Sequence, residues 1–266
     1  MLKIKNRSIL KTRIISYILR KIATLENKND SNIHTNGERA FIIGILDYYS
    51  KINTKQLTIF DVGANIGNYV NELITLNSKH QTKLEIHTFE PLTENIHEQI
   101  HRFKDLNNIK INNFGLSNSD SSSKIYYKED NTELASLYQR NLKMYNTAFN
   151  KTEIIQLKSG QNYIETNNIK KVHLLKIDVE GHELKVLQGL GEYIHIVDFI
   201  QFEYGNCNID SNTRLAEIYE LLSQNNFIIG KMMKKYIEIQ KYSKQMEDYV
   251  YSNYVAINKN ILKNIK

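Results

Sequence analysis

The sequence predicts an α/β fold in which helices cover both faces of a mostly parallel sheet. Apolar runs of strand length alternate with segments whose apolar residues recur at helical spacing, which is typical of a doubly wound sheet. The run at 171–181 is apolar over most of its length, as in a strand buried on both faces. Acidic residues follow several of these runs, where such sheets bind ligands.

Seven strands are expected along the chain. They lie at 57–60, 83–90, 109–117, 171–181, 197–205, 227–240 and 252–258, and the last two are expected to form an antiparallel, hairpin-like edge. Helical spacing marks four segments between them, at 66–74, 96–103, 182–190 and 215–222. The long polar segment 118–170 contains only short strand-like runs, and we interpret it as an insertion over the ligand face.

Composition sets the broad class of protein. A chain of 266 residues with 41% apolar residues suits one α/β domain with additions. Its only cysteine, Cys207, excludes an internal disulfide and fits a reducing compartment. The net charge of +6 is compatible with an anionic partner or with a lysine-rich surface. The oligomeric state is not encoded in any readable pattern.

Residues 1–40 are interpreted as a basic helical extension of a domain at 41–266. The extension lacks the uninterrupted apolar region and the cleavage site of a signal peptide, so we expect a cytoplasmic protein. The apolar residues of residues 1–22 recur at helical spacing, at Ile14, Ile15, Ile18, Leu19 and Ile22. Such a segment either caps a domain or makes a peripheral contact with the inner membrane surface.

The first candidate site is the stretch "FDVGANIGN", where small residues follow the first strand. Glycine lets the backbone turn sharply and approach a ligand, and the helix that follows offers free N–H donors. A diphosphate bound here would be repelled by Asp61, whereas the amino and sulfonium groups of S-adenosylmethionine would be attracted. The predicted cofactor-binding residues of this loop are Asp61, Gly63, Ala64, Asn65 and Gly67. The alternative is a tight turn with an exposed acid.

Two further strand ends complete the predicted cofactor site. Glu90 ends the second strand, where an acid can accept hydrogen bonds from both ribose hydroxyls. Leu116 and Ser117 end the third strand, where the adenine ring would rest. The spacing between Asp61 and Glu90 makes the loop a stronger indication of S-adenosylmethionine than the glycines alone.

A second cluster, "KIDVEGHE", ends the fourth strand. The predicted catalytic residues are His182, Asp178, Glu180 and, from the fifth strand, Glu203, and Asp178 is also expected to contact the cofactor. His182 is predicted as the base that accepts a hydroxyl proton, with Asp178 or Glu203 orienting it or the acceptor. Alternatively, His182 and Glu183 only begin a helix. A divalent metal held by the four predicted catalytic residues is a further alternative that we do not favour.

Together these clusters resemble the FkbM-type methyltransferases, a family of the Rossmann-like class I fold. The matching text is "FDVGANIGNYV", "FEP" at 89–91, "NFGLSN" at 113–118, "ASLY" at 135–138, "LLKIDVEGHELKVLQG" at 174–189, "FEYG" at 202–205 and "NYVAIN" near the end. The resemblance covers about 57–258 and leaves residues 1–40 outside.

The resemblance implies transfer of a methyl group from S-adenosylmethionine to a hydroxyl, often of a sugar in a polysaccharide, glycolipid or natural product. It implies the cofactor at Asp61, Gly63, Asn65, Gly67 and Glu90, and the acceptor near Asp178, Glu180 and His182. Family members commonly carry Thr-Leu-Asp before the fourth strand, whereas this chain reads "SGQNY" at 159–163. The resemblance therefore does not define the shape of the acceptor pocket.

Three rival functions would each leave a different sequence feature. A nucleic-acid methyltransferase acting on base amino groups often carries an Asn/Asp-Pro-Pro motif, which a chain whose only proline is Pro91 lacks. The acids after the fourth strand would also repel a phosphate backbone. A nicotinamide oxidoreductase would show G-x-G-x-x-G after the first strand. A non-catalytic module that keeps the fold is the third rival.

Overall fold

The computed structural model describes residues 9–129, 131–140, 142 and 147–264. Its main layer is an eight-stranded sheet in the order β11-β10-β12-β9-β8-β1-β2-β3. The five parallel strands are β1 (Gln56–Val62), β2 (Lys83–Phe89), β3 (Ile109–Asn112), β8 (Val172–Ile177) and β9 (Val197–Tyr204). Their carboxyl ends meet at one edge of the sheet, which the sequence had predicted as the ligand edge.

The last strands are antiparallel, but their arrangement differs from a simple edge hairpin. β12 (Ser252–Asn258) lies between β9 and β10 (Phe227–Met232), and it is antiparallel to both. The expected strand at 227–240 divides in two, because β11 (Ile237–Ile239) folds back on β10 and forms the edge. The sheet therefore has one strand more than the seven expected.

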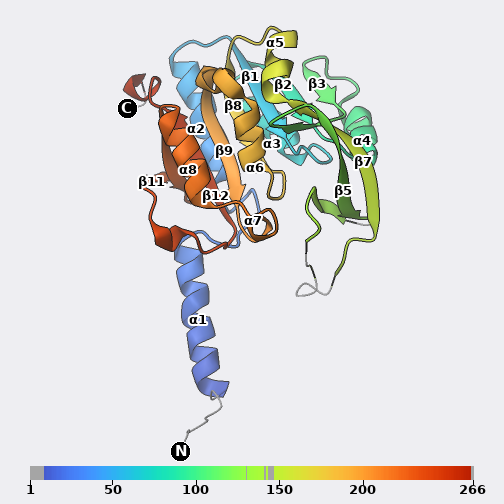
Figure 1. The fold of residues 1–266 in the computed structure, drawn as a ribbon. Coiled ribbons are helices and arrows are strands. Elements are labelled where there is room, and N and C mark those ends of the chain that lie inside the picture. The colour runs from blue at the N-terminus through green and yellow to red at the C-terminus, as the bar shows by residue number, and fades with distance from the viewer. Residues whose placement is uncertain (1–8, 130, 141, 143–146, 265–266) are drawn as a thin grey trace, which may run out of the picture.

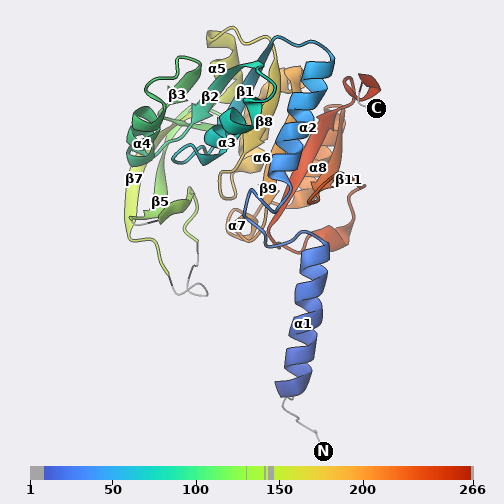
Figure 2. The ribbon, with the colours of Figure 1, turned by 180° about the vertical axis from the view of Figure 1, so that it is seen from behind.

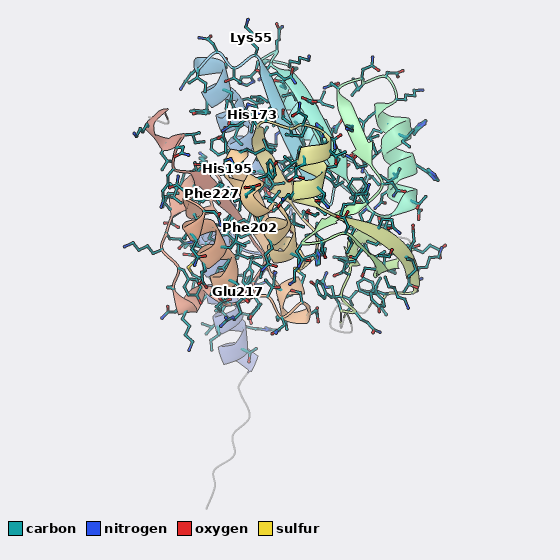
Figure 3. All side chains as sticks on the ribbon, turned by 45° about the horizontal axis from the view of Figure 1, so that its top comes forward. Lys55, His173, His195, Phe202, Glu217 and Phe227 are labelled. Atoms are coloured by element: carbon teal, nitrogen blue, oxygen red, sulfur yellow. The ribbon has the colours of Figure 1, made fainter. Side chains whose placement is uncertain are left out.

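Helices cover both faces of this sheet, as predicted. α2 (Glu38–Lys51), α3 (Asn68–Asn77) and α4 (Thr93–Phe103) contribute to one buried cluster, and α5 (Gly160–Thr166), α6 (Glu183–Gly189) and α8 (Leu215–Gln224) contribute to the other (Figures 1 and 2). Neighbouring residues such as Ile59 and Phe60 belong to opposite clusters, which explains the continuous apolar runs. Phe202 and Phe227 are fully buried beneath α8 (Figure 3).

The remaining helices are short. They are α7 (Cys207–Asp210) and the 3-10 helices η2 (Gly191–Ile196), η3 (Lys244–Met246) and η4 (Leu262–Asn264). α5 begins in the "SGQNY" stretch, where the Ser159 side chain accepts a hydrogen bond from the backbone N–H of Asn162. That stretch thus supplies a helix N-cap in place of the Thr-Leu-Asp element.

A second, four-stranded sheet has the order β4-β7-β5-β6. Its strands are β4 (Gly115–Ser117), β5 (Ser121–Lys128), β6 (Asn131–Ser136) and β7 (Lys151–Ser159). The prediction of a single strand at 109–117 is therefore wrong, because the strand breaks after Asn112. The side-chain amide of Asn112 donates to the Thr88 carbonyl and the Tyr163 hydroxyl. The break passes the chain from the main sheet to the second one. Residues 130, 141 and 143–146 of the expected insertion lie outside the described part of the chain.

The N-terminal helix α1 (Ile9–Leu25) projects away from the rest of the molecule in both ribbon views (Figures 1 and 2). Residues 26–37 then return the chain to the body, and α2 begins at Glu38. Residues 38–40 of the expected extension thus belong to a helix packed against the main sheet. Residues 1–8 of the expected membrane-contacting segment lie outside the described part.

Candidate active site

A cavity of about 920 Å³ opens at the carboxyl ends of the parallel strands. Its walls come from the loop after β1, the loops after β8 and β9, the second sheet and the segment 29–34. Strand ends and loops converge here because parallel strands all finish at the same edge of a sheet.

Asp61 lies at the end of β1 and is fully buried. Neither carboxylate oxygen accepts a hydrogen bond within the described residues, and Oδ1 lies 3.8 Å from the Nζ atom of Lys176. Burial raises the pKa of Asp61 to about 6, although Lys176 opposes the shift. The predicted exposed-acid alternative is therefore wrong: Asp61 is a buried carboxylate with unused hydrogen-bonding capacity, and it is not among the residues that line the cavity.

The two glycines of this loop have positive φ angles, 80° at Gly63 and 84° at Gly67. A Cβ atom on Gly63 would lie 1.8 Å from the carbonyl oxygen of Asp178, and one on Gly67 would lie 2.4 Å from the ring of Phe103. The bare backbone thus lets the loop pack against the end of β8 and against α4, rather than only making room for a ligand. Gly63 and Ala64 line the cavity, whereas the lining does not include Gly67.

Glu90 follows β2 and joins the loop to this strand end. Its Oε2 accepts a hydrogen bond from the backbone N–H of Asn65 at 2.9 Å, and its Oε1 accepts one from Leu92 at 2.9 Å. Burial raises the pKa of Glu90 to about 7. Glu90 and Asn65 both line the cavity, so the carboxylate faces the space while its backbone partners hold it.

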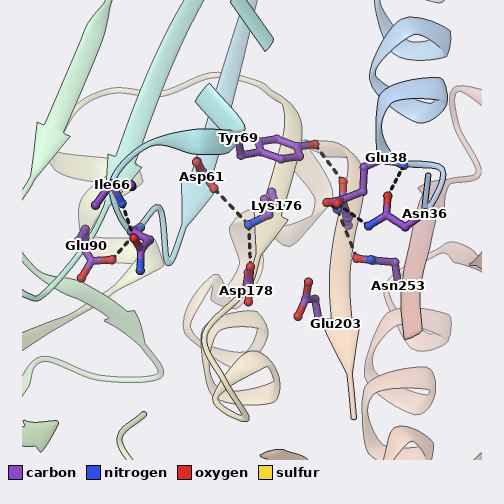
Figure 4. Close-up of polar contacts among 12 residues, drawn as sticks. Asn36, Glu38, Asp61, Ile66, Tyr69, Glu90, Lys176, Asp178, Glu203 and Asn253 are labelled. Carbon is purple, nitrogen blue, oxygen red and sulfur yellow. Dashed lines mark hydrogen bonds and ion pairs between the residues drawn. The ribbon is translucent and has the colours of Figure 1, made fainter. Parts of the chain in front are cut away.

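Lys176 is the centre of the site, although no sequence pattern singled it out. Its Nζ atom lies 3.0 Å from Oδ2 of Asp178 and 5.1 Å from the centre of the Tyr69 ring (Figure 4). Burial by itself would lower the pKa of Lys176, but the carboxylates of Asp178, Asp61, Glu38 and Glu203 raise it above the usual range. Lys176 is therefore a buried ammonium ion inside an acidic cluster.

A hydrogen-bonded network lies behind Lys176. Gln201 donates to Oε1 of Glu38 at 2.5 Å, and Tyr69 donates to Oε1 of Gln201 at 2.9 Å. Asn36 donates to Oε2 of Glu38 at 2.7 Å (Figure 4). This network ties α2 and α3 to β9 beside the cavity. No motif marked it, because its members lie far apart in the sequence.

Two of the predicted catalytic residues, Asp178 and Glu180, follow β8 and line the cavity. Asp178 is partly exposed and is held by Lys176. Glu180 accepts a hydrogen bond through Oε2 from the Arg140 guanidinium at 2.6 Å. Burial raises the pKa of Glu180 to about 8, even though Arg140 opposes the shift. At pH 7 this carboxyl group is therefore mostly protonated, and its ionised form, which is a stronger proton acceptor than an ordinary carboxylate, becomes the main form above about pH 8.

His182 lies at the cavity but is already engaged. Its Nε2 atom lies 2.9 Å from the Ser117 hydroxyl, and its Nδ1 atom lies 2.9 Å from the Tyr138 hydroxyl. Burial lowers the pKa of His182 to about 4. The ring is therefore neutral at pH 7, and its single lone pair is directed at a neighbouring hydroxyl. This geometry is less suited to a base than we expected from the sequence.

Ser117 and Leu116 lie at the end of β4, not of the third main-sheet strand. Leu116 lines the cavity, while Ser117 is buried against His182 and is not part of the lining. Glu183 begins α6 and accepts hydrogen bonds from the Gly181 N–H and from Asn208, as in the helix-start alternative.

Glu203 lines the cavity from β9 and accepts a hydrogen bond from the Tyr251 hydroxyl at 2.6 Å. Burial, and then the nearby charge of Asp178, raise the pKa of Glu203 above its usual range. Within the described residues no three or more His, Cys, Asp and Glu side chains are grouped to hold a metal ion. In this geometry Glu180 is paired with Arg140 and His182 with two hydroxyls.

Arg140 is a cavity-lining residue that the sequence did not identify. Its side chain is 7% exposed and also lies 3.6 Å from Asp210, measured from Nε. That Nε atom makes no hydrogen bond within the described residues. Arg140 follows the "ASLY" stretch by two residues, which is the only sequence feature near it.

The strand arrangement and the position of the cavity define a Rossmann-like class I methyltransferase fold. The profile of the Methyltransferase FkbM domain family matches residues 61–229, which is more than half of the chain. The protein belongs to this family. The match includes the loop after β1 and the "KIDVEGHE" cluster.

The chain is similar to a curated protein and to several solved structures. Hexuronic acid methyltransferase AglP of Haloferax volcanii is 33% identical over 82 residues, which cover 27% of this chain and 34% of AglP. The crystal structure of Methyltransferase FkbM from Methylobacillus flagellatus is 16% identical, with a TM-score of 0.47, and the match covers 76% of this chain and 44% of that one. TrmK of M. capricolum, solved with S-adenosyl-homocysteine, is 11% identical with a TM-score of 0.41. The match covers 80% of this chain and 67% of the TrmK chain.

The chain thus spans about a third of the length of the curated relative and less than half of the FkbM structure. Among the described residues, no helix combines the length and apolar character needed to cross a bilayer.

Proposed function

We propose that this protein transfers a methyl group from S-adenosylmethionine to a hydroxyl group of a sugar that carries a carboxylate. The observation that carries the proposal is that the family segment supplies both walls of one cavity. The loop after β1 forms the first wall, and the acids after β8 form the second. A methyl donor and an acceptor would therefore meet between them.

The residues of the first wall fit the cofactor. The amino and sulfonium cations of S-adenosylmethionine match the carboxylate of Asp178, which lines the cavity, and the carboxylate of Asp61 lies buried behind this wall, 3.8 Å from Lys176. Glu90 would bind the ribose hydroxyls through lone pairs not used by Asn65 and Leu92, and Leu116 would contact the adenine. A volume of about 920 Å³ is large enough for a cofactor together with part of an acceptor.

The second wall would act on the acceptor. Bound S-adenosylmethionine supplies an electrophilic methyl group on sulfur. The acceptor oxygen forms a C–O bond as the C–S bond breaks, and the hydroxyl proton must move to a base. We assign that role to Glu180, because it lines the cavity and has one carboxylate oxygen without a bond to Arg140. His182 then positions Tyr138 and Ser117 beside the cavity.

Arg140 supports an acidic acceptor. Its guanidinium is nearly buried in the cavity wall, where Nη1 donates to Glu180 and the buried Nε lies 3.6 Å from Asp210. A guanidinium in a cavity wall can bind a carboxylate ligand through its planar N–H donors. AglP, which shares 33% identity over 82 residues, is described as a hexuronic acid methyltransferase. A uronic acid is therefore the acceptor class that we favour.

Two measurements test this function. Calorimetric titration should show binding of S-adenosylmethionine and none of NAD; binding of NAD alone would contradict the assignment. Transfer of labelled methyl should then be compared among a uronic-acid glycoside, its neutral hexose counterpart and RNA. We expect product with the uronic acid, and transfer only to RNA would overturn the acceptor class.

A further inference from the structure

The positive charge of the chain is concentrated at its N-terminus. The whole sequence has 35 Lys and Arg residues against 29 Asp and Glu residues. Residues 1–25 contain seven of the basic residues, at Lys3, Lys5, Arg7, Lys11, Arg13, Arg20 and Lys21, and none of the acidic ones. The remaining 241 residues therefore carry 28 basic and 29 acidic side chains, and are close to neutral. The basic pI thus reflects one segment rather than the surface as a whole.

The helix in this segment, α1, is amphipathic. Ile14, Ile18, Ile22 and Leu25 follow one another at steps of four, four and three, so they lie along one side of the helix. Arg13, Ser16, Arg20 and Thr24 lie on the opposite side. The apolar side is not covered by the rest of the described chain, because exposed fractions reach 51% at Ile14, 49% at Ile18, 48% at Ile22 and 76% at Leu25.

We propose that α1 docks this protein onto a bilayer surface that contains anionic phospholipids. The apolar side would enter the boundary between headgroups and acyl chains, while the arginine side would face the phosphates. A helix of 17 residues is about 25 Å long, shorter than the roughly 30 Å hydrocarbon core, so it suits a helix lying in the surface.

The positive charge of residues 1–25 favours a membrane over a second copy of this chain as the partner of α1. Two α1 helices packed through their apolar sides would bring two segments of seven basic residues each together without one acidic residue to pair with them. An anionic bilayer offers both an apolar layer and negative charge. Nucleic acid offers the charge but would leave the isoleucine side exposed to water.

The base of α1 is fixed beside the cavity. Asn27 donates to the carbonyl oxygens of Asn36, at 2.6 Å, and Met232, at 3.0 Å, and the backbone N–H of Asn29 donates to the Tyr251 carbonyl at 3.0 Å. The segment 29–34 that follows lines the cavity. Docking through α1 would therefore hold the cavity rim near the bilayer.

The test uses the full chain and needs no methyl-transfer assay, so it is independent of the proposed function. The protein is sedimented with vesicles of phosphatidylcholine alone and with vesicles of equimolar phosphatidylcholine and phosphatidylglycerol. We expect partitioning onto the anionic vesicles to be stronger by roughly tenfold or more, and to weaken as salt is added. Equal partitioning onto both vesicles, or none onto either, would overturn the proposal.

Two variants and a matched control locate the contact. The double variant I18E/I22E should lose roughly tenfold or more of its partitioning, and R13Q/R20Q/K21Q should lose the preference for phosphatidylglycerol. The control I154E/I239E introduces the same charges at residues that are 64% and 51% exposed elsewhere, and should bind like wild type. An equal loss in the control would contradict the proposal. So would a wild-type dimer that I18E/I22E dissociates while leaving vesicle binding unchanged.

Discussion

The ammonium group of Lys176 lies 3.0 Å from the carboxylate of Asp178, two residues further along the chain. Both side chains lie at the cavity, and the Asp61 carboxylate lies on the other side of the ammonium at 3.8 Å. A single buried cation thus holds together the two strand ends, β1 and β8, between which we place the cofactor and the acceptor.

Replacing Lys176 with methionine should destabilise the fold. Asp61 and Asp178 would lose the cation between them, and removing one partner of a buried ion pair costs about 3 kcal/mol. Urea denaturation measures the free energy of unfolding. Lys55→Met, at an exposed position, is the control and should change this free energy by less than about 0.5 kcal/mol. A Lys176→Met protein as stable as the control would refute the role of the lysine.

Gly63→Ala should be destabilising by at least about 2 kcal/mol, because the new Cβ would meet the Asp178 carbonyl and φ is positive. Gly44→Ala provides the contrast. That glycine lies inside α2 with no atom within 4 Å of the added Cβ, so the substitution should stabilise by about 0.5–1 kcal/mol. Thermal or urea unfolding measures both, and equal effects at the two positions would contradict this view of the loop.

Glu180→Gln should lower kcat by roughly 10²–10⁴-fold while binding of S-adenosylmethionine stays close to wild type. The base must be ionised, so the wild-type rate should rise with pH and reach half its plateau near the Glu180 pKa of about 8. Glu192→Gln, at an exposed position, is the control. If His182 were the base, with its pKa of about 4, the rate would already be flat above pH 6, and His182→Ala would lose more turnover than Glu180→Gln.

Arg140→Lys should raise KM for a uronic-acid acceptor by roughly tenfold, because an ammonium cannot reproduce the planar donors of guanidinium. The KM for a neutral sugar should stay unchanged. Arg214→Lys, on an exposed side chain, is the matched control. Steady-state kinetics with both acceptors measures the difference. Equal KM changes for the acidic and the neutral sugar would remove the argument for a carboxylate contact.

The cofactor-free protein should become more stable as pH falls from about 9 to about 7. Glu180, Glu90 and Glu183 have folded-state pKa values of about 8, 7 and 7, above those of an unfolded chain. A raised carboxyl pKa means that the folded state binds protons more tightly, so this stability is lost as pH rises through those values.

Below about pH 6.5 the trend should weaken, because burial lowers the pKa values of His87, His173 and His182. These histidines bind protons more weakly in the folded state, so they oppose folding as pH falls. Urea denaturation at several pH values checks both parts. If the free energy of unfolding decreased as the pH was lowered from 9 to 7, that result would contradict the raised carboxyl pKa values.

Local patterns in the sequence determined the fold class, the ligand edge and the family. Apolar periodicity located most strands and helices, because each element must bury one or both of its faces. "FDVGANIGNYV" and "LLKIDVEGHELKVLQG" identified the two walls of the cavity, because both are contiguous segments that end neighbouring parallel strands. Such features depend on residues close together in the chain.

Tertiary structure decided the partners of each side chain. Tyr138 reaches His182 across 44 residues, and Gln201 reaches Glu38 across 163. No sequence pattern links such pairs, because topology alone brings them together. Burial raises the pKa of the Glu180 carboxyl group and lowers that of the His182 imidazole. Both His182 nitrogens also have a hydroxyl partner, so the tertiary structure favours Glu180 over His182 as the proposed base.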